Sequence, residues 1–176
     1  MAEIKPFSPV KLICGLIASQ EKHFGRAKDD LMSLFGDIDL ESVEFAFNLT
    51  EYYERQLGPG LKRKFLSFRI LIRPEELSVI KHRTNLLEEE TQKNFLEDHR
   101  IINIDPGYIT ASALIMATAK DFSHRIPLGQ GIYAHLEFLF SKTGLKTLEW
   151  TYPDFRGNAY REFFLTVRKL YLQQLK

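Results

Sequence analysis

The stretch KLICGLIASQEKHFGRAKDDLMSLFG, residues 11–36, decides the fold class. Its apolar beginning, 11–19, predicts an interior β-strand. In Glu21–Phe35 the apolar side chains recur at helical spacing, so this segment predicts a helix. Gly36 follows directly, in the position where helices commonly end on a glycine of positive φ. A strand followed by a helix predicts a fold that mixes the two kinds of element.

Further elements follow along the first half of the chain. Alternation of apolar and polar side chains predicts strands at 43–47 and 66–72. Between them, residues 50–60 predict a short helix followed by a Gly-Pro-Gly turn. Pro74 suits the first position of a second long helix. The acidic stretch 87–98 then predicts a solvated loop.

Isoleucines at 101, 102 and 104 predict another strand, which we expect to stop at Asp105-Pro106-Gly107. Proline presets one dihedral angle of a β-turn and glycine takes the positive one, so this triplet is typical of a turn. Such a turn could also present Asp105 to a ligand or a metal. The next apolar stretch, 113–117, is too short for its periodicity to separate strand from helix.

The last part of the chain predicts a hairpin and a closing helix. Residues 132–140 alternate as a strand, and Lys142-Thr143-Gly144 forms a turn into a second strand at 145–150. The whole order predicts an α+β fold: a ferredoxin-like (split β-α-β) core with an added C-terminal β-hairpin and a closing helix. We expect residues 1–176 to form a single domain.

The composition excludes several classes of protein. Of the 176 residues, 44% are hydrophobic, which suffices for a sizeable core. The formal charge of +1 gives no global field that would draw the molecule onto a nucleic acid or a membrane. Cys14 is the single cysteine, which excludes intramolecular disulfides and predicts a reducing, cytoplasmic location. No apolar run approaches the roughly 20 residues of a membrane-spanning helix.

The loops contain most of the side chains suited to binding or catalysis, and loops on a rigid scaffold are where sites concentrate. The candidate ligand-binding site consists of Asp105, Tyr108, Lys120, Asp121, His124, Arg125, Trp150, Tyr152, Asp154 and Arg156. These residues match no catalytic signature and point to no particular cofactor. His124, His135 and Asp105 are spread over different elements, which favours structural or solvent-facing histidines over a metal site.

The first loop cluster has two interpretations. His124 and Arg125 could supply a general acid or base with an anion clamp, because histidine titrates near neutrality and arginine binds phosphate or carboxylate bidentately. Alternatively, an ion pair between Asp121 and Arg125 orders the loop, and neither residue takes part in chemistry.

The second loop cluster also has two interpretations. Residues 150–154 could form an aromatic platform for a base or a sugar, with Arg156 and Arg161 holding phosphate. Alternatively, Trp150 caps the core and Asp154 starts the last helix.

Basic residues gather along the strand predicted at 66–72 and just before it. Arg63 and Arg69 lie on the face opposite the apolar residues, so they predict a solvated strand face. If that face instead lines a cleft, several cations would converge there and predict an anionic ligand. The other contributors would be Lys120, Arg125 and Arg156.

Distinctive short sequence motifs occur along nearly the whole chain. They are PVKL at 9–12, TEYYE at 50–54, KRKFLSF at 62–68, NIDPGY at 103–108, SHRI at 123–126, GQGIYA at 129–134 and WTYPD at 150–154. In these motifs the chain resembles a family of short prokaryotic proteins described as domain of unknown function 4416. Some members are labelled GTP-binding proteins, so the resemblance implies GTP as a ligand.

The motif that usually holds GTP is missing from the sequence. A P-loop reads G-x-x-x-x-G-K-[ST], because consecutive backbone amides must wrap the phosphates. At Gly58-Pro59-Gly60-Leu61-Lys62 the spacing differs, and Pro59 has no amide hydrogen to donate. Gly129-Gln130-Gly131 precedes a predicted strand, where a dinucleotide fingerprint would open a helix. If the protein binds GTP, it uses another architecture.

Three hypotheses of function follow. We favour a binding or catalytic domain for a phosphate-bearing small ligand or nucleotide, without a P-loop. One alternative is an RNA-binding module that combines aromatic stacking with the basic strand, and the other is a structural protein that forms a homo-oligomer. The near-neutral charge favours the first hypothesis over broad nucleic-acid binding. The expected partner is therefore an anionic small molecule or nucleotide, with no membrane involved.

Overall fold

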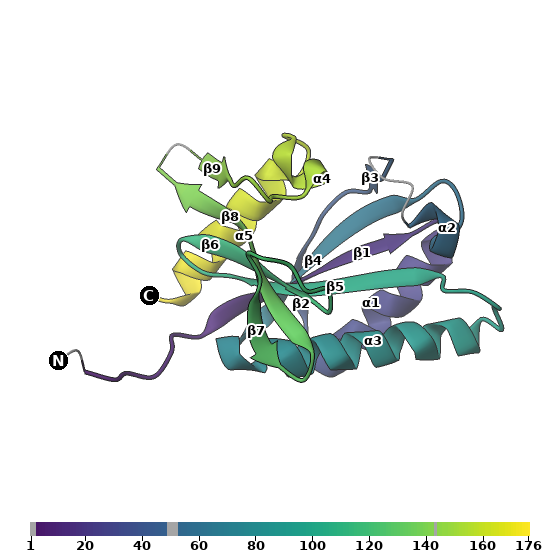
Figure 1. Cartoon of the computed structure of the whole chain (residues 1–176), viewed down its shortest axis with the longest axis horizontal. Coiled ribbons are helices and arrows are strands. Elements are labelled where there is room, and N and C mark those ends of the chain that lie inside the picture. The colour runs from purple at the N-terminus through teal and green to yellow at the C-terminus, as the bar shows by residue number, and fades with distance from the viewer. Residues whose placement is uncertain (1–2, 49–52, 143) are drawn as a thin grey trace.

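A computed structural model describes residues 3–48, 53–142 and 144–176 of the protein (Figure 1). These residues form nine strands and five α-helices, with all the strands in one antiparallel sheet. The strands are β1 Val10–Ala18, β2 Ile38–Glu41, β3 Phe45–Ala46, β4 Lys62–Ile72, β5 Ile102–Ile109, β6 Ala113–Thr118, β7 Ile126–Gly129, β8 Ile132–Ser141 and β9 Gly144–Thr147. The α-helices are α1 Glu21–Phe35, α2 Glu54–Leu57, α3 Leu77–Asn94, α4 Pro153–Arg156 and α5 Arg161–Gln174, and a 3-10 turn at Pro74–Glu76 leads into α3.

The strands lie in the spatial order β2-β4-β1-β5-β6-β8-β7, with β3 beside β4 and β9 beside β8. At the centre, β1 pairs with β4 on one side and with β5 on the other. Every residue of β1 is buried, which explains its apolar sequence, because a strand covered on both faces needs no polar side. The prediction of an interior first strand is confirmed.

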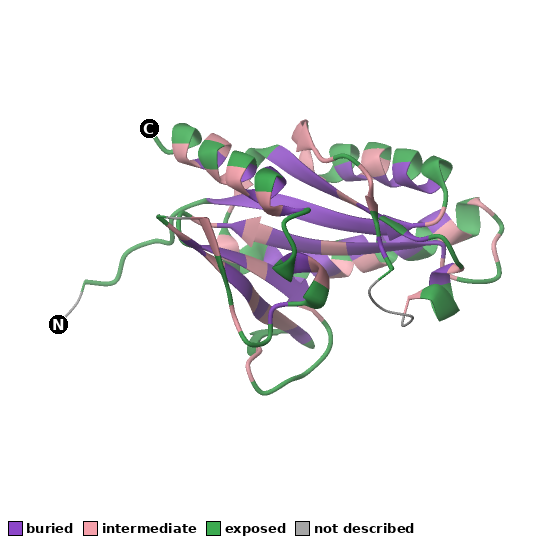
Figure 2. Cartoon of the chain, turned by 90° about the horizontal axis from the view of Figure 1, so that it is seen from above, coloured by how far each residue is buried: buried purple, intermediate pink, exposed green. Residues whose placement is uncertain are grey.

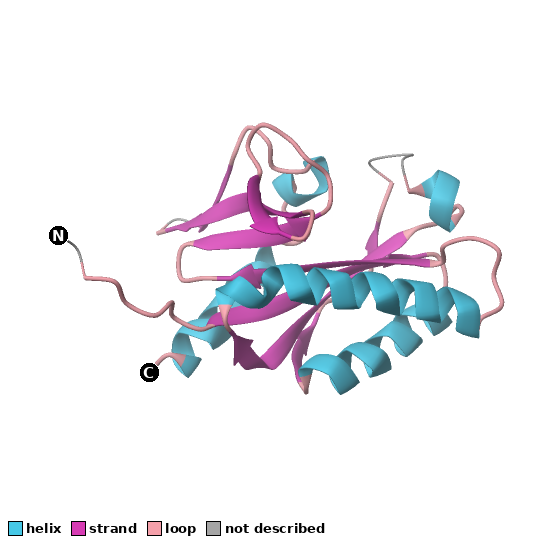
Figure 3. Cartoon of the chain, turned by 60° about the horizontal axis from the view of Figure 1, so that its bottom comes forward, coloured by secondary structure: helices cyan, strands magenta, loops and turns pink. Residues whose placement is uncertain are grey.

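Helices cover both faces of the sheet. Neighbouring residues of a strand point to opposite faces, so Leu12 and Ile13 of β1 belong to different hydrophobic clusters. Leu12 packs with Phe24 of α1 and with α3, whereas Ile13 packs with Phe164 of α5. Figures 1 and 3 show α1 and α3 together on one side of the sheet. Figure 2 shows the buried strands lying between helices whose outer faces are exposed.

Several predicted elements are confirmed. The helix at Glu21–Phe35 and the closing helix are present, and the strands predicted at 66–72 and 132–140 lie within β4 and β8. The ambiguous stretch 113–117 is strand β6. Gly36 ends α1 with a φ of 85°, and its N–H donates to the carbonyl oxygen of Met32.

Two predictions fall partly outside the described residues, because the segment 50–60 includes 50–52 and the hairpin turn includes Thr143. Helix α2 confirms the short helix of the first segment. After the turn, β9 pairs with β8 as the predicted hairpin requires. The strand predicted at 145–150 is shorter than expected, because β9 ends at Thr147.

The acidic segment 87–98 is mostly helix rather than the predicted loop, because α3 continues to Asn94. Leu87, Glu88 and Thr91 are buried and continue the inward face of the helix at helical spacing. The acidic composition of this segment therefore reflects the exposed side of an amphipathic helix together with one buried glutamate.

The β-turn predicted at Asp105-Pro106-Gly107 is also wrong, because β5 runs straight through these residues. They pair with Gly15, Cys14 and Ile13 of β1. Among the described pairs, β6 joins β5 only from Gly107 onward. Pro106 therefore lies where the sheet is open on one side, which is the position in which a strand tolerates proline.

The edges of the sheet differ from the prediction. The strand predicted at 43–47 is replaced by two short strands, β2 and β3, which both pair with β4. The prediction also lacks β7, which pairs with β8 at the opposite edge and is exposed along its length. Strands this short contain too few residues for an alternating pattern to be recognised in the sequence, so they are identified only by their pairing with a neighbouring strand.

We expect Gly107→Ala to lower the free energy of unfolding by about 1–3 kcal/mol, because the added methyl group overpacks the sheet. A Cβ atom at this position would lie 2.6 Å from the carbonyl oxygen of Ile115 and 2.5 Å from Sδ of Met116. Urea denaturation measures the change. The matched control is Gly25→Ala in α1, where a Cβ meets nothing within 4 Å and should stabilise the helix. Equal stabilities of the two variants would contradict the prediction.

Candidate functional site

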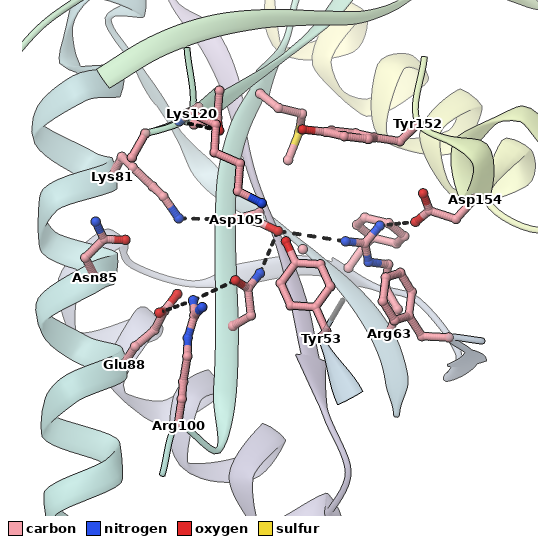
Figure 4. Close-up of a pocket in the computed structure, with 18 of the residues that line it drawn as sticks. Tyr53, Arg63, Lys81, Asn85, Glu88, Arg100, Asp105, Lys120, Tyr152 and Asp154 are labelled. Carbon is pink, nitrogen blue, oxygen red and sulfur yellow. Dashed lines mark hydrogen bonds and ion pairs between the residues drawn. The ribbon is translucent and has the colours of Figure 1, made fainter. Parts of the chain in front are cut away.

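A pocket of about 750 Å³ lies between α3, the sheet and the segment that contains α4 (Figure 4). Its walls come from β4, α3, β5, the end of β6 and residues 152–155. Several aromatic rings and many charged or polar side chains line it. The polar residues and tyrosines labelled in Figure 4 are Tyr53, Arg63, Lys81, Asn85, Glu88, Arg100, Asp105, Lys120, Tyr152 and Asp154.

Asp105 lies at the centre of this pocket and is held by donors from three elements. Nζ of Lys81 lies 3.4 Å from Oδ1, while Nδ2 of Asn103 donates to Oδ2 over 2.6 Å. Nη2 of Arg63 lies 3.8 Å from Oδ2. Burial works to raise the pKa of Asp105, but Lys81 and Arg63 outweigh it and hold the pKa below its ordinary value. Asp105 is therefore a carboxylate at neutral pH.

Arg63 of β4 is buried, with 6% of the residue exposed, and forms an ion pair with Asp154 of α4. Its guanidinium carbon lies 4.7 Å from the centre of the Phe47 ring and 5.4 Å from that of Phe155. Burial works to lower the pKa of Arg63, but Asp154 and Asp105 raise it above its ordinary value. The prediction that this strand face is solvated is wrong for Arg63, because α4 covers it.

The α3 wall carries Lys81 and Glu88, which fix β5 and the residues before it. Nζ of Lys81 donates to the carbonyl oxygen of Ile104 over 2.8 Å. Glu88 accepts the N–H of Ile104 over 2.6 Å and forms an ion pair with Arg100. Arg100 also donates to Oδ1 of Asn103 over 2.6 Å. Burial raises the pKa of Glu88, against the opposing effect of Lys81 and Arg100.

Lys120 follows β6 and is exposed at the edge of the pocket. Its Nζ lies 6.0 Å from the centre of the Tyr53 ring. Burial raises the pKa of Tyr53, so this phenol stays protonated at neutral pH. The cations of the pocket thus come from four separate parts of the chain: β4, α3, the segment before β5 and the segment after β6.

A second group of side chains, which we name the Tyr152 cluster, adjoins the pocket. It consists of His124, Arg125, His135, Glu137, Trp150 and Tyr152. The His124 ring stacks on Trp150 with centroids 4.8 Å apart, and the His135 ring stacks on Tyr152 at the same distance. Nε2 of His124 lies 3.0 Å from Nδ1 of His135. Tyr152 belongs to both groups, so it connects the cluster to the pocket.

Four of the ten predicted residues line the pocket, namely Asp105, Lys120, Tyr152 and Asp154. The others do not line it: Tyr108, Asp121, His124, Arg125, Trp150 and Arg156. Tyr108 packs, half-buried, near Leu77, and Asp121 is exposed. Arg156 donates to the backbone carbonyls of Thr151 and Glu149.

Two of the earlier alternatives are corrected by the contacts. Arg125 donates to the carbonyl oxygen of Lys120 and to the hydroxyl of Tyr152, rather than pairing with Asp121. Asp154 lies in α4 rather than at the start of the closing helix. No three histidine, cysteine, aspartate or glutamate side chains among the described residues are placed to hold a metal ion.

Lys81, Glu88, Arg100 and Asn103 are pocket residues that the prediction lacks. A signal for two of them was present, because Lys81 and Glu88 share the helical spacing of Leu77 and Thr84 and so fall on the buried side of α3. A lysine and a glutamate on the inward face of a helix need partners, since burying an unpaired charge is costly. Arg100 and Asn103 carry no comparable pattern.

The fold and the pocket together define an α+β protein that holds a polar cavity, formed by buried ion pairs, beside a single antiparallel sheet. The chain belongs to the family described as domain of unknown function (DUF4416), whose model matches residues 8–171. This match confirms the resemblance seen in its short sequence motifs. No match was found among curated proteins or among solved structures. None of the helices in the described residues combines the length and the apolar composition needed to cross a membrane.

Proposed function

We propose that the pocket binds a phosphate-bearing small molecule or a nucleotide. One observation carries this proposal: Arg63, Lys81, Arg100 and Lys120 converge on a cavity of about 750 Å³, although they come from four separate parts of the chain. A cavity of this volume is in the range of small-molecule sites. Arginine and lysine side chains supply the charge-assisted hydrogen bonds by which proteins bind phosphate.

The ion pairs inside the pocket favour recognition of a ligand by direct contact rather than by long-range electrostatic attraction. Asp105, Asp154 and Glu88 hold three of the cations in fixed positions, which lowers the entropy lost when those cations bind a ligand. Because the same carboxylates neutralise them, the pocket exerts little long-range pull on anions. The aromatic walls, which include Tyr53 and Tyr152, suit a planar ring of the ligand.

The same features weigh against an RNA-binding surface. Arg63 and Lys81 are buried, so neither can follow the backbone of a polynucleotide across the surface. Arg69 and Arg73, which are exposed, do not line the pocket. An RNA module would need such cations on an open face beside stacking rings.

The topology supports the ferredoxin-like core that we propose for this chain. Strands β1, β2, β4 and β5 alternate with α1 and α3 in the order β-α-β-β-α-β, and their spatial order is β2-β4-β1-β5. This order supports a split β-α-β core to which β3, α2, β6 to β9 and α5 are additions. We propose that core and addition form a single domain.

The first test is a thermal-shift screen against nucleotides, phosphorylated metabolites and divalent metals. A ligand at about 100 times its Kd should add about 2.7 kcal/mol of stability. We expect phosphate-bearing compounds to raise Tm, whereas salt-sensitive binding to single-stranded RNA without any small-molecule effect would favour the RNA module instead. A panel without any shift would remove the proposal.

Lys120→Ala is expected to weaken binding of the phosphate-bearing ligand about tenfold or more, because one charge-assisted hydrogen bond is lost. Lys120 is exposed, so the variant should keep the stability of the parent protein. Isothermal titration measures the affinity. Lys146→Ala is the matched control, since Lys146 is an exposed lysine of β9 outside the pocket. Equal affinities of the two variants would show that Lys120 takes no part in binding.

A further inference from the structure

Arg125 lies outside the pocket and joins two of the residues that line it. Its Nη1 donates to the carbonyl oxygen of Lys120 over 2.7 Å, and its Nη2 donates to the hydroxyl oxygen of Tyr152 over 2.8 Å. One planar guanidinium thus fixes the backbone of Lys120 and the phenol of Tyr152 relative to each other. Figure 4 shows Lys120 and Tyr152 on the same side of the pocket, with the side chain of Lys120 extending toward Asp105.

The contact with Arg125 determines what the Tyr152 hydroxyl can offer a ligand. A guanidinium has only donors, so the Tyr152 oxygen must accept in this contact. The single hydroxyl hydrogen is then left to donate elsewhere, and Tyr152 lines the pocket. The ammonium group of Lys120 also has donors and no acceptor. The side chains of Tyr152 and Lys120 therefore both offer hydrogen-bond donors to a ligand in the pocket.

Two buried side chains, those of His135 and Glu137, hold Tyr152 in place. His135 and Glu137 are 1% and 0% exposed, and Nε2 of His135 lies 3.0 Å from Oε2 of Glu137. The His135 ring stacks on the Tyr152 ring, and Oε1 of Glu137 accepts the Tyr152 N–H over 2.7 Å. Both the ring and the backbone of Tyr152 are therefore fixed.

A bulge in β8 makes this support possible. Ile115 of β6 is opposite Leu136, whereas the preceding Leu114 is opposite Phe138, so Glu137 has no partner of its own on β6. A bulge of this kind re-aims side chains, and Glu137 here becomes fully buried beside His135. Bulges are frequent next to functional sites.

We infer that Lys120 and Tyr152 form the subsite for the phosphate group, with Arg125 as a positioning residue. This inference rests on the proposed function. The donors of Arg63, Lys81 and Arg100 are already engaged by Asp154, Asp105 and Glu88, so a phosphate would have to compete with these carboxylates for them. The phosphate therefore binds the donors of Lys120 and Tyr152, and the uncharged part of the ligand faces the aromatic walls.

The test compares Tyr152→Phe with the unaltered protein, using the four ribonucleoside monophosphates and their nucleosides as probes in isothermal titration. The variant keeps the ring that stacks on His135 and loses only the hydroxyl. We expect it to bind monophosphates about tenfold more weakly, because a hydrogen bond to a charged group is lost. Affinity for nucleosides should not change. Tyr108→Phe, outside the pocket, is the matched control.

Arg125→Lys tests the positioning role, because a lysine keeps the charge but cannot hold both partners. In the unaltered background it should weaken monophosphate binding, and in the Tyr152→Phe background it should have a much smaller effect. Equal losses for nucleosides and monophosphates would mean that Tyr152 acts only on the structure, which overturns the inference. Unchanged monophosphate binding by Tyr152→Phe would overturn it too, while leaving the proposed function intact. If the unaltered protein binds no monophosphate, the inference fails, and the thermal-shift panel alone decides the proposed function.

Discussion

Replacing Arg63 by alanine is expected to lower the free energy of unfolding by about 3–5 kcal/mol, among the largest effects of any single substitution in the pocket. The change removes the partner of Asp154 and one of the partners of Asp105, so two carboxylates are left without sufficient compensation. It also removes the contacts of the guanidinium with Phe47 and Phe155. Urea denaturation at pH 7 measures the loss.

Two controls separate the charge from the packing. Adding Asp154→Asn to Arg63→Ala should recover part of the stability, because the uncompensated charge is removed as well. Acidification should shrink the difference between the variant and the unaltered protein. The pKa of Asp105 is depressed in the folded state, so its stabilising contribution is present above the unfolded value of about 3.9 and is lost as pH falls through the folded pKa. A small loss of stability that does not depend on pH would contradict this account of Arg63.

Phe65→Ala should cost a similar amount, about 3–5 kcal/mol, for a different reason. Phe65 is fully buried and contacts the rings of Tyr160, Phe163 and Phe164, with centroids 4.9–5.6 Å apart. Its removal leaves a cavity that these rings cannot fill, because Phe163 and Phe164 belong to α5 and Tyr160 directly precedes it. The loss should be independent of pH, which distinguishes it from the loss at Arg63.

The matched control for Phe65 is Phe7→Ala, since Phe7 is 74% exposed and its loss should change stability by less than about 0.5 kcal/mol. Phe65 also lines the pocket, so the alanine variant enlarges the site. Denaturation curves for the two variants that coincide would mean that the aromatic cluster contributes little to folding.

The sequence was most informative about long elements with a single pattern. The strand β1 and the helix α1 could be predicted because burial on both faces and amphipathicity leave clear patterns over many residues. At Asp105-Pro106-Gly107 the prediction failed, because local turn chemistry was overridden by pairing with β1. Residues such as proline and glycine favour a turn in an isolated segment. Pairing of β5 with β1 along one edge is enough to outweigh that preference.

The site could be predicted only in part, for reasons that particular residues make clear. The sequence predicts four of the pocket residues because they lie in predicted loops that are rich in polar and aromatic side chains. These four are Asp105, Lys120, Tyr152 and Asp154. Lys81 and Glu88 were not, because charged residues within a helix usually lie on its solvent side. Arg63 was assigned to a solvated face, since alternation along β4 shows which side chains share a face but not what covers it.

The ion pair between Arg63 and Asp154 spans 91 positions of the chain, and Lys11 donates to Gln174 across 163. The chain is synthesised from its N-terminus, so Asp154 is added 91 residues after Arg63. Until then the ion pair between them cannot form. The pocket is thus among the last features to form, after the slow closure of these long-range contacts. For the ligand that we propose, the number of binding sites per chain in a titration should therefore equal the fraction of completely folded molecules.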